Sequence, residues 1–354
     1  MRRSIALAAI LVTLTLSCAA CSQPIDTGSP VPAQAQPLTA LLALVGIGIA
    51  LTALHHHDQR KSGGGGGANL QPAAVVRLAD GSRSIDLAVD VVSGTAGILQ
   101  ARSGNTPAQY VQVSAGTIVG SYSLPPGYDP TALALDAGLN EWFVDATGNI
   151  DYCPAPASGT AACTPTATVS DGLGPSTTRS IAADSAFALV AVDNGSGTVA
   201  WTAFSLGGGS PIRGSYSYAG RPLYPADAMS QNSAGGISSF ILFHQDGASY
   251  QLQFPSTTTK QPFALAPPPA SAPANVADQT FYGLLGSPSG LYQIGRYFND
   301  GTAASLAPQA VIDIASGGQT ANNSFSVPLR ALRADSLNVS ALDRNGNLIQ
   351  YAAF

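Results

Sequence analysis

The amino-acid sequence predicts an all-β fold, a six-bladed β-propeller, from three observations. First, a strand–turn–strand unit recurs six times at intervals of 46 to 57 residues, within the range of propeller blades. Second, each unit joins apolar strands through glycine-rich turns. Third, the 354 residues include one Glu and two Lys, which argues against surface helices, while the Val, Thr, Tyr and Gly content suits short strands. The copies align on the residue that ends a short apolar strand: Asp90, Asp136, Asp184, Ser230, Asp278 and Asp335.

The clearest copy spans residues 181–205 and reads IAADSAFALVAVDNGSGTVAWTAFS. A short strand runs into Asp184, a second reaches Val192, and a third follows an Asp-Asn-Gly-Ser-Gly turn. Asn-Gly and Ser-Gly supply the positive φ angles that a tight reversal needs, so the copy predicts a β-hairpin. Nearly continuous apolar runs such as Phe187–Val192 are typical of sheets that are packed on both faces.

The other units repeat this arrangement. Their middle strands are predicted at Glu141–Asp145 with Ile150–Cys153, Phe240–Gln245 with Tyr250–Phe254, Phe281–Leu285 with Leu291–Phe298, and Leu337–Asp343 with Leu348–Phe354. A fourth, outer strand is predicted at Thr117–Leu124, Ala167–Ser170, Ile212–Tyr218, Pro262–Leu265 and Val311–Ile314. Four antiparallel strands per unit, arranged radially, are how a propeller limits its exposed sheet edges.

The ring is expected to close through its first strand. The last unit reaches Phe354 with three strands, and Ala73–Ala79 precedes the first unit without a partner of its own. We therefore expect Ala73–Ala79 to pair with Leu348–Phe354. The longest interval contains two segments predicted to be loops, Asn299–Ala307 and Ser316–Ser324. Seven blades and a β-solenoid are the alternatives.

Residues 1–21 are predicted to be an export signal. Two arginines precede the apolar run Ile5–Leu16, which is too short to be read first as a membrane span. The following Ser-Cys-Ala-Ala-Cys, residues 17–21, resembles the lipobox of bacterial lipoproteins, in which small residues precede a cysteine that is acylated after cleavage. The resemblance implies a lipid anchor on Cys21. The usual Leu three positions earlier is absent, and an ordinary cleaved signal peptide is the alternative.

Three segments are expected between this signal and the propeller. Residues 22–37 are rich in Pro, Gln, Ser and Ala and form a linker. Leu38–Leu54 is uncharged and apolar, and as a helix it would be about 25 Å long. It either spans the membrane, lies at its surface or packs on a partner helix. Residues 55–69 are a polar and glycine-rich hinge, and residues 70–354 are the propeller.

The run ALVAVDNGSGTVAWTAF, within residues 188–204, resembles the repeat of lactonase-like and YVTN-type bacterial propellers. In that repeat a Tyr-Val-Ala-Asn-like strand precedes a Gly-Ser-rich turn and a Thr-Val-containing strand. The resemblance implies the propeller fold and says little about function, because such motifs specify blade geometry. The chain departs from the family in showing six periods, where the family usually has seven.

The sequence predicts no catalytic residue, metal or cofactor, because it contains no nucleophile elbow, phosphate loop or dinucleotide fingerprint. The recurring aspartates are expected to cap turns through backbone N–H groups. His244 is expected to be a hydrogen-bonded strand residue. The short strand that ends at each anchor residue should line a central channel. The candidates for ligand binding there are Asp86, Arg179, Asp227, Asn275 and Arg330.

The four cysteines predict one disulfide. Cleavage of the signal removes Cys18, and lipidation uses Cys21. Cys153 and Cys163 then remain as an even pair in an oxidising compartment, where disulfides persist.

These features predict a membrane-anchored binding or scaffold module in the bacterial cell envelope, either periplasmic or surface-exposed. Its partner is expected to be a peptide, a glycan or another envelope protein. The net charge of −5 comes without a basic patch, which argues against nucleic acid. The alternative is a lactonase-like hydrolase with its site in the central channel.

Overall fold

In the computed structural model the chain divides into two units, Met1–Gly66 and Gly67–Phe354. The structure describes parts of the second unit: residues 72–90, 93–154, 167–176, 179–231, 238–256, 258–260, 263–270, 273–276, 280–286, 292–313, 329–335, 337–343 and 345–354. The export signal, the lipid anchor at Cys21, the linker, Leu38–Leu54 and most of the hinge lie outside these residues and stay predictions. Within these ranges, no helix has the length and apolar character needed to cross a membrane.

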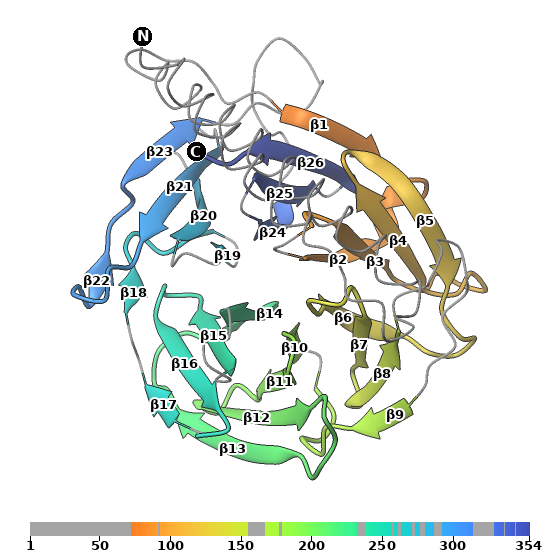
Figure 1. The fold of residues 1–354 in the computed structure, drawn as a ribbon, viewed down its shortest axis with the longest axis horizontal. Coiled ribbons are helices and arrows are strands. Elements are labelled where there is room, and N and C mark those ends of the chain that lie inside the picture. The colour runs from red at the N-terminus through yellow and green to blue at the C-terminus, as the bar shows by residue number, and fades with distance from the viewer. Residues whose placement is uncertain are drawn as a thin grey trace, which may run out of the picture. The chain divides into compact units, whose positions relative to one another are not determined.

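The described residues form six four-stranded antiparallel sheets arranged in a ring, which confirms the six-bladed propeller (Figure 1). The first three sheets follow the chain in order. They contain β2 (Ser84–Val89), β3 (Ala96–Gln100), β4 (Gln109–Ser114) and β5 (Thr117–Ser123); β6 (Pro130–Leu135), β7 (Glu141–Asp145), β8 (Asn149–Cys153) and β9 (Ala167–Ser170); and β10 (Arg179–Ala183), β11 (Phe187–Asp193), β12 (Thr198–Ser205) and β13 (Ile212–Ser217).

The other three sheets complete the ring. They contain β14 (Leu223–Gln231), β15 (Ser238–His244), β16 (Ser249–Phe254) and β17 (Thr258–Lys260); β19 (Ala274–Val276), β20 (Thr280–Gly286), β21 (Tyr292–Phe298) and β23 (Ala310–Asp313); and β24 (Leu329–Ala334), β25 (Asn338–Asp343), β26 (Asn347–Ala352) and β1 (Pro72–Arg77). The innermost strands β2, β6, β10, β14, β19 and β24 contact one another in this order, and β24 returns to β2. A three-residue 3₁₀ turn, η2 (Gly81–Arg83), links β1 to β2.

Strand β1 closes the ring by pairing with β26, as predicted from the sequence. Val75 lies opposite Ile349 and Arg77 lies opposite Asn347 in this antiparallel pair. The last sheet therefore takes its outer strand from the start of the propeller and three strands from its end. This pairing removes the exposed edge that β26 would otherwise present.

Two expectations about the outer strands were wrong. The outer strand of the fourth sheet is β17, whereas the predicted strand Pro262–Leu265 contributes only β18 (Ala264–Leu265). Strand β18 pairs in parallel with β22 (Ser305–Leu306), which lies in the segment Asn299–Ala307 that was expected to be a loop. The pairing depends on the packing of two neighbouring sheets, which strand patterns within one unit do not reveal. The other predicted loop, Ser316–Ser324, lies outside the described residues.

The core lies between neighbouring sheets. Leu189, Trp201 and Leu242, from the third and fourth sheets, belong to one cluster of buried side chains. Residues Ala188, Val190 and Phe204, also from the third sheet, belong to another cluster on its side towards the second sheet. Each sheet thus buries both faces, which explains the unbroken apolar run in β11.

Candidate functional site

The strands alternate in direction, so the loops of the ring gather on two faces. We define the connection face as the one that carries the turn between the second and third strands of each sheet and the segments that lead from one sheet to the next. The opposite face carries the turns between first and second strands and between third and fourth strands.

The anchor aspartates cap the turns on the opposite face, as predicted. Each carboxylate accepts backbone N–H groups two to four residues further along the chain. Three of these carboxylates accept two backbone N–H groups each: Asp136 from Gly138 and Asn140, Asp184 from Ala186 and Phe187, and Asp335 from Leu337 and Asn338. Asp90 accepts from the backbone and hydroxyl of Ser93. The anchor Asp278 lies outside the described residues, as does the side chain of Ser230.

A second row of aspartates caps turns on the connection face in the same way. Asp145, Asp193, Asp246 and Asp343 each accept backbone N–H groups of the turn that follows. Such side-chain caps replace the strand hydrogen bonds that the turn residues lack. The loops on both faces are therefore held by their own carboxylates.

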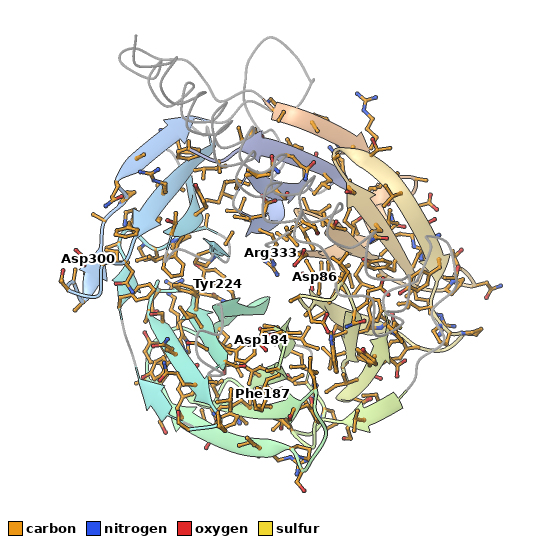
Figure 2. All side chains as sticks on the ribbon, viewed as in Figure 1. Asp86, Asp184, Phe187, Tyr224, Asp300 and Arg333 are labelled. Atoms are coloured by element: carbon orange, nitrogen blue, oxygen red, sulfur yellow. The ribbon has the colours of Figure 1, made fainter. Side chains whose placement is uncertain are left out.

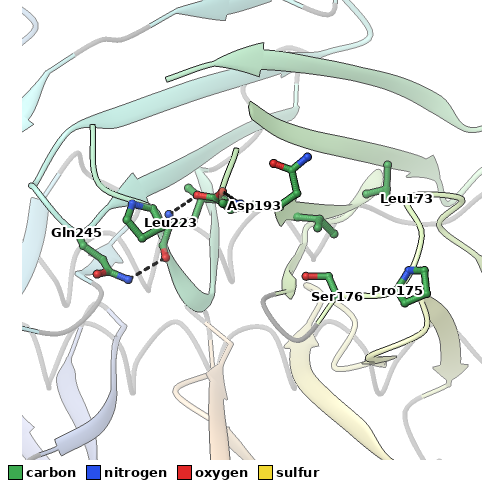
Figure 3. Close-up of a pocket in the computed structure, with 10 residues that line it drawn as sticks. Leu173, Pro175, Ser176, Asp193, Leu223 and Gln245 are labelled. Carbon is green, nitrogen blue, oxygen red and sulfur yellow. Dashed lines mark hydrogen bonds between the residues drawn. The ribbon is translucent and has the colours of Figure 1, made fainter. Parts of the chain in front are cut away.

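A pocket of about 460 Å³ opens on the connection face, where the third and fourth sheets meet the segment that follows β9 (Figure 3). Ten residues from four loop segments line it: Leu173, Pro175, Ser176, Val192, Asp193, Asn194, Gly195, Pro222, Leu223 and Gln245. No single sequence motif contains these residues, so the pocket could not be predicted from the sequence.

Hydrogen bonds between the third and fourth sheets fix one wall of the pocket. Asp193 Oδ1 accepts the N–H of Gly195 at 2.8 Å in its own turn, and Oδ2 accepts the N–H of Leu223 at 2.8 Å from the next sheet. The side-chain amide of Gln245 donates to the Leu223 carbonyl at 3.2 Å (Figure 3). Leu223 is thus held through both of its backbone groups.

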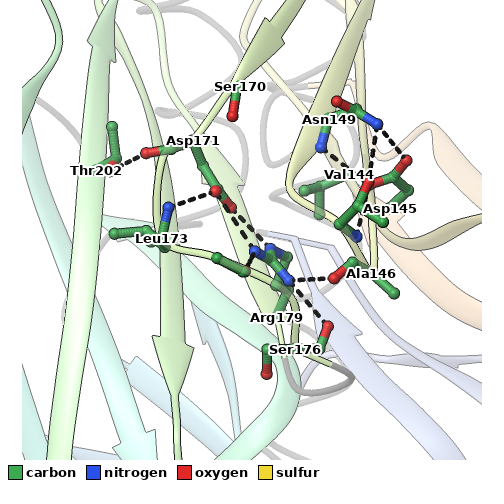
Figure 4. Close-up of polar contacts among 12 residues, drawn as sticks. Val144, Asp145, Ala146, Asn149, Ser170, Asp171, Leu173, Ser176, Arg179 and Thr202 are labelled. Atoms are coloured by element: carbon green, nitrogen blue, oxygen red, sulfur yellow. Dashed lines mark hydrogen bonds and ion pairs between the residues drawn. The ribbon is translucent and has the colours of Figure 1, made fainter.

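A buried ion pair fixes the other wall (Figure 4). Arg179 Nε donates to Asp171 Oδ2 at 2.7 Å, and both side chains are fully buried. The guanidinium also donates to the carbonyls of Ala146, Gly174 and Ser176. Asp171 Oδ1 accepts the N–H of Leu173 at 2.8 Å. The pair therefore organises the segment 171–176 that supplies Leu173, Pro175 and Ser176 to the pocket.

Gly148 is required beside this ion pair. Its φ is +91°, and a Cβ at this position would collide with Asp171 Oδ1 and lie 2.8 Å from Arg179 Nη2. A residue with a side chain would be strained here both in its backbone and in its contacts.

The five predicted channel residues have different positions in the structure. Arg179 is in the buried pair described above. Asp86, on β2, accepts the N–H groups of Leu87 and Leu133 at 2.8 Å each, and Arg333 Nη2 lies 3.5 Å from its Oδ1 (Figure 2). Asp227, Asn275 and Arg330 are on β14, β19 and β24, but their side chains lie outside the described part of the structure.

The structure therefore pairs Asp86 with Arg333, a residue that the sequence analysis did not single out. Arg333 is on β24, the innermost strand of the last sheet, as Arg330 is. The signal that selected Arg330, a charge among apolar residues of an inner strand, also applies to Arg333. The described residues show no contact between Asp86 and Arg179.

Glu141 is buried where the first and second sheets meet. It accepts a hydrogen bond from the hydroxyl of Tyr122, a residue of β5. Burial raises the pKa of Glu141 to about 7, an effect that the hydroxyls of Tyr122 and Tyr110 offset only in part. Tyr110 also packs edge-to-face on Phe143. The carboxyl group thus lies among aromatic rings rather than beside a cation.

His244 is a hydrogen-bonded strand residue, as predicted. It ends β15, and its Nδ1 donates to the carbonyl of Arg221 at 2.8 Å. Its Nε2 lies 3.2 Å from the Tyr216 hydroxyl. Burial lowers the pKa of His244, which favours the neutral ring.

Two further features concern the predicted chemistry. Within the described residues, no group of three or more His, Cys, Asp and Glu side chains is placed to hold a metal ion. Cys153 ends β8 and is buried, but Cys163 lies outside the described part of the chain, so the disulfide stays a prediction.

Comparisons with known proteins find similar solved structures at low sequence identity. No family model matches the chain, and no curated protein matches its sequence. It is similar to the solved structure of U3-55K, with 10% identity and a TM-score of 0.49, over 80% of this chain and 100% of that one. The WD40 repeats of RRP9 share 9% identity, with a TM-score of 0.49, over 81% and 82% of the two chains.

BamB from Moraxella catarrhalis shares 10% identity, with a TM-score of 0.46, over 80% of this chain and 100% of that one. At these identities and scores the similarities carry no functional argument, and the propeller fold rests on the six sheets themselves. The expected relation to lipoproteins and to lactonase-like and YVTN-type propellers stays a prediction.

Proposed function

We propose that this protein is a membrane-anchored binding or scaffold module of the bacterial cell envelope, which holds a protein or glycan partner on the connection face of its ring. The observation that carries the proposal is the pocket on that face. Four loop segments from three sheets converge there, and buried polar contacts hold both walls. Loops positioned by a rigid scaffold are where binding residues are concentrated in proteins.

The direction from which the chain enters the ring supports this choice of face. Pro72, the first residue of β1, lies opposite Tyr351 near the end of β26, on the opposite face. Arg77, at the other end of β1, lies opposite Asn347, next to the turn of the connection face that Asp343 caps. The first strand of the ring therefore begins at the face opposite the pocket.

The sequence supports the anchor. An export signal, a cysteine at position 21 and an apolar segment at Leu38–Leu54 precede a glycine-rich hinge. We expect the substitution Cys21→Ser to release the protein from the membrane fraction unless Leu38–Leu54 also holds it there. Fractionation of the Cys21→Ser variant and of a variant that also lacks residues 38–54 separates the two contributions.

Photo-crosslinking in living cells tests the binding role. A photoreactive phenylalanine analogue replaces Pro175, an exposed residue of the pocket, or Thr117, an exposed residue at the opposite face, in the full chain. We expect a discrete adduct of higher mass from position 175 and none from position 117. Adducts of equal yield from both positions, or none from either, would contradict the proposal.

A further inference from the structure

We infer that the pocket on the connection face accepts an uncharged peptide segment, whose aliphatic or prolyl side chain fills it. This inference rests on the proposed function and names the class of partner that the function requires. It follows from the size, the walls and the charges of the pocket.

The size of the pocket suits a short segment of a larger molecule. Its volume of about 460 Å³ lies within the range of roughly 300–1,000 Å³ that is typical of ligand sites. Pro175, Asn194, Gly195 and Pro222 are exposed, so the pocket opens directly on the surface. A projecting segment of a partner can therefore enter while the rest of the partner stays outside.

The walls of the pocket are half apolar. Half-buried Leu173 and the exposed Pro175 and Pro222 contribute most of the accessible apolar surface, because Val192 and Leu223 are only 4% and 5% exposed. An aliphatic or pyrrolidine side chain that enters this space removes apolar surface from water on both partners, which favours binding.

The carboxylate in the pocket is nearly buried, and both of its oxygens are already hydrogen-bonded. Among the described residues of the lining Asp193 is the only charged one, it is 9% exposed, and each of its carboxylate oxygens accepts a backbone N–H. The guanidinium of Arg179, behind the wall, is bound to Asp171 and to three carbonyls. Neither Arg221 nor Asp246 belongs to the lining. An acidic group that enters would be repelled by Asp193. A basic group would lose its hydration for a carboxylate that is scarcely exposed and already hydrogen-bonded, so the pocket favours a neutral occupant.

The polar part of the lining suits a peptide better than a sugar. Asn194 Oδ1 accepts from Ser196 and Gln245 Nε2 donates to Leu223, while the amide nitrogen of Asn194 and the amide oxygen of Gln245 match the C=O and N–H groups of a peptide backbone. A sugar ring carries hydroxyl groups around most of its edge. Several of them would face the apolar walls without hydrogen bonds, and each such burial costs free energy.

A library of random 12-residue peptides displayed on phage tests the inference with the detergent-solubilised full chain. Enriched peptides are synthesised, and their dissociation constants are measured on the wild type and on two variants, Pro175→Arg and Pro126→Arg. Pro175 lines the pocket, whereas Pro126 is an exposed proline in the equivalent connection between the first and second sheets. Circular dichroism melts establish that both variants fold.

We expect peptides that share one aliphatic or prolyl residue among uncharged neighbours. Binding should weaken at least tenfold on Pro175→Arg and stay within twofold on Pro126→Arg, and replacement of the shared residue by Lys or Asp should also cost at least tenfold. The inference is overturned if the enriched peptides depend on a charged residue, or if no peptide depends on Pro175. If either of these results is obtained but a partner still crosslinks to position 175 in cells, the proposed binding function stands. Only the inference about the chemistry of the bound segment is then removed.

Discussion

Buried acidic side chains in this protein fall into two groups. Both carboxylate oxygens of Asp171 and of Asp193 accept hydrogen bonds. Among the described residues, Glu141 Oε1, Asp184 Oδ2 and Asp335 Oδ2 are buried without a hydrogen-bond partner. In Glu141 and Asp335 the loss of water around the carboxyl group on folding disfavours its charged form. The raised pKa values of Glu141 and Asp335 follow from this burial.

We predict that Glu141 makes the folded protein less stable as the pH rises. Burial raises its pKa to about 7 in the folded state from about 4.5 in the unfolded chain, so the folded state holds the proton more tightly than the unfolded state. The resulting stability is fully present below pH 4.5 and is lost as the pH rises through 7. The loss is at most about 3.5 kcal/mol, since a pKa difference of one corresponds to about 1.4 kcal/mol.

Urea unfolding of the wild type and of Glu141→Gln at pH 5 and pH 8 measures this effect. The wild type should lose more stability between the two pH values than the variant, because Gln does not titrate. The substitution Asp129→Asn, at an exposed position, serves as the control and should follow the wild type. An identical pH dependence for the wild type and Glu141→Gln would contradict the assignment.

We also predict that Asp171→Asn destabilises the protein strongly. The substitution removes the charge that compensates the fully buried guanidinium of Arg179. Removal of one partner of a buried pair typically costs about 3–5 kcal/mol in unfolding free energy. Chemical denaturation measures the change, with Asp80→Asn at an exposed position as the control. A loss below about 1 kcal/mol would show that the pair does not organise the segment 171–176.

At the scale of elements, the sequence was most informative where a glycine turn joins two apolar strands. The hairpin of β11 and β12 was predicted within a residue or two, because its turn residues and its apolar runs are local signals. The outer strands were less predictable. Strand β17 is three residues long, and β18 pairs with a distant segment, so neither has a distinctive local pattern.

The register of the closing strand gives a sharp test at this scale. Val75 on β1 lies directly opposite Ile349 on β26. Directly opposed residues of an antiparallel pair are close enough for a disulfide, whereas neighbouring residues on a strand point to opposite faces of the sheet. We predict that Val75→Cys with Ile349→Cys forms a disulfide on mild oxidation and that Ala74→Cys with Ile349→Cys does not. After the chain is cleaved between the two cysteines, non-reducing electrophoresis shows whether a disulfide still joins the two fragments. Equal crosslinking of both cysteine pairs would contradict the register.

The predicted disulfide can be tested in the same way. If Cys153 and Cys163 are joined, the protein unfolded without reductant should show no reactive thiol from either position. Cys153→Ser should lower the unfolding free energy by about 2–3 kcal/mol, because the disulfide closes a short loop in the unfolded chain. Two reactive thiols in the unreduced protein would refute the pairing.

At the scale of the whole molecule, the number of blades could be read from the sequence and the candidate site could not. The period of the anchor aspartates gives the six sheets because each sheet is a local unit of the chain. The pocket joins Leu173, Asp193, Pro222 and Gln245, which come together only when neighbouring sheets pack. Arg179 stands out in the sequence as a charge among apolar residues, but the pairing with Asp171 that explains its position spans two sheets.

The central claim, that the connection face is occupied by a partner in the cell, is tested most directly by thiol accessibility. Asn194→Cys places a thiol at the exposed rim of the pocket, and Thr117→Cys places one at the opposite face. Each variant of the full chain is alkylated with membrane-permeant N-ethylmaleimide, in intact cells and after purification, and the two rates are compared. We predict that Cys at position 194 is alkylated at least fivefold more slowly in cells than in the purified protein. For Cys at position 117, the ratio of the rate in cells to the rate after purification should equal that of a free thiol standard. Equal protection of the two positions, or no protection at position 194, would contradict the account.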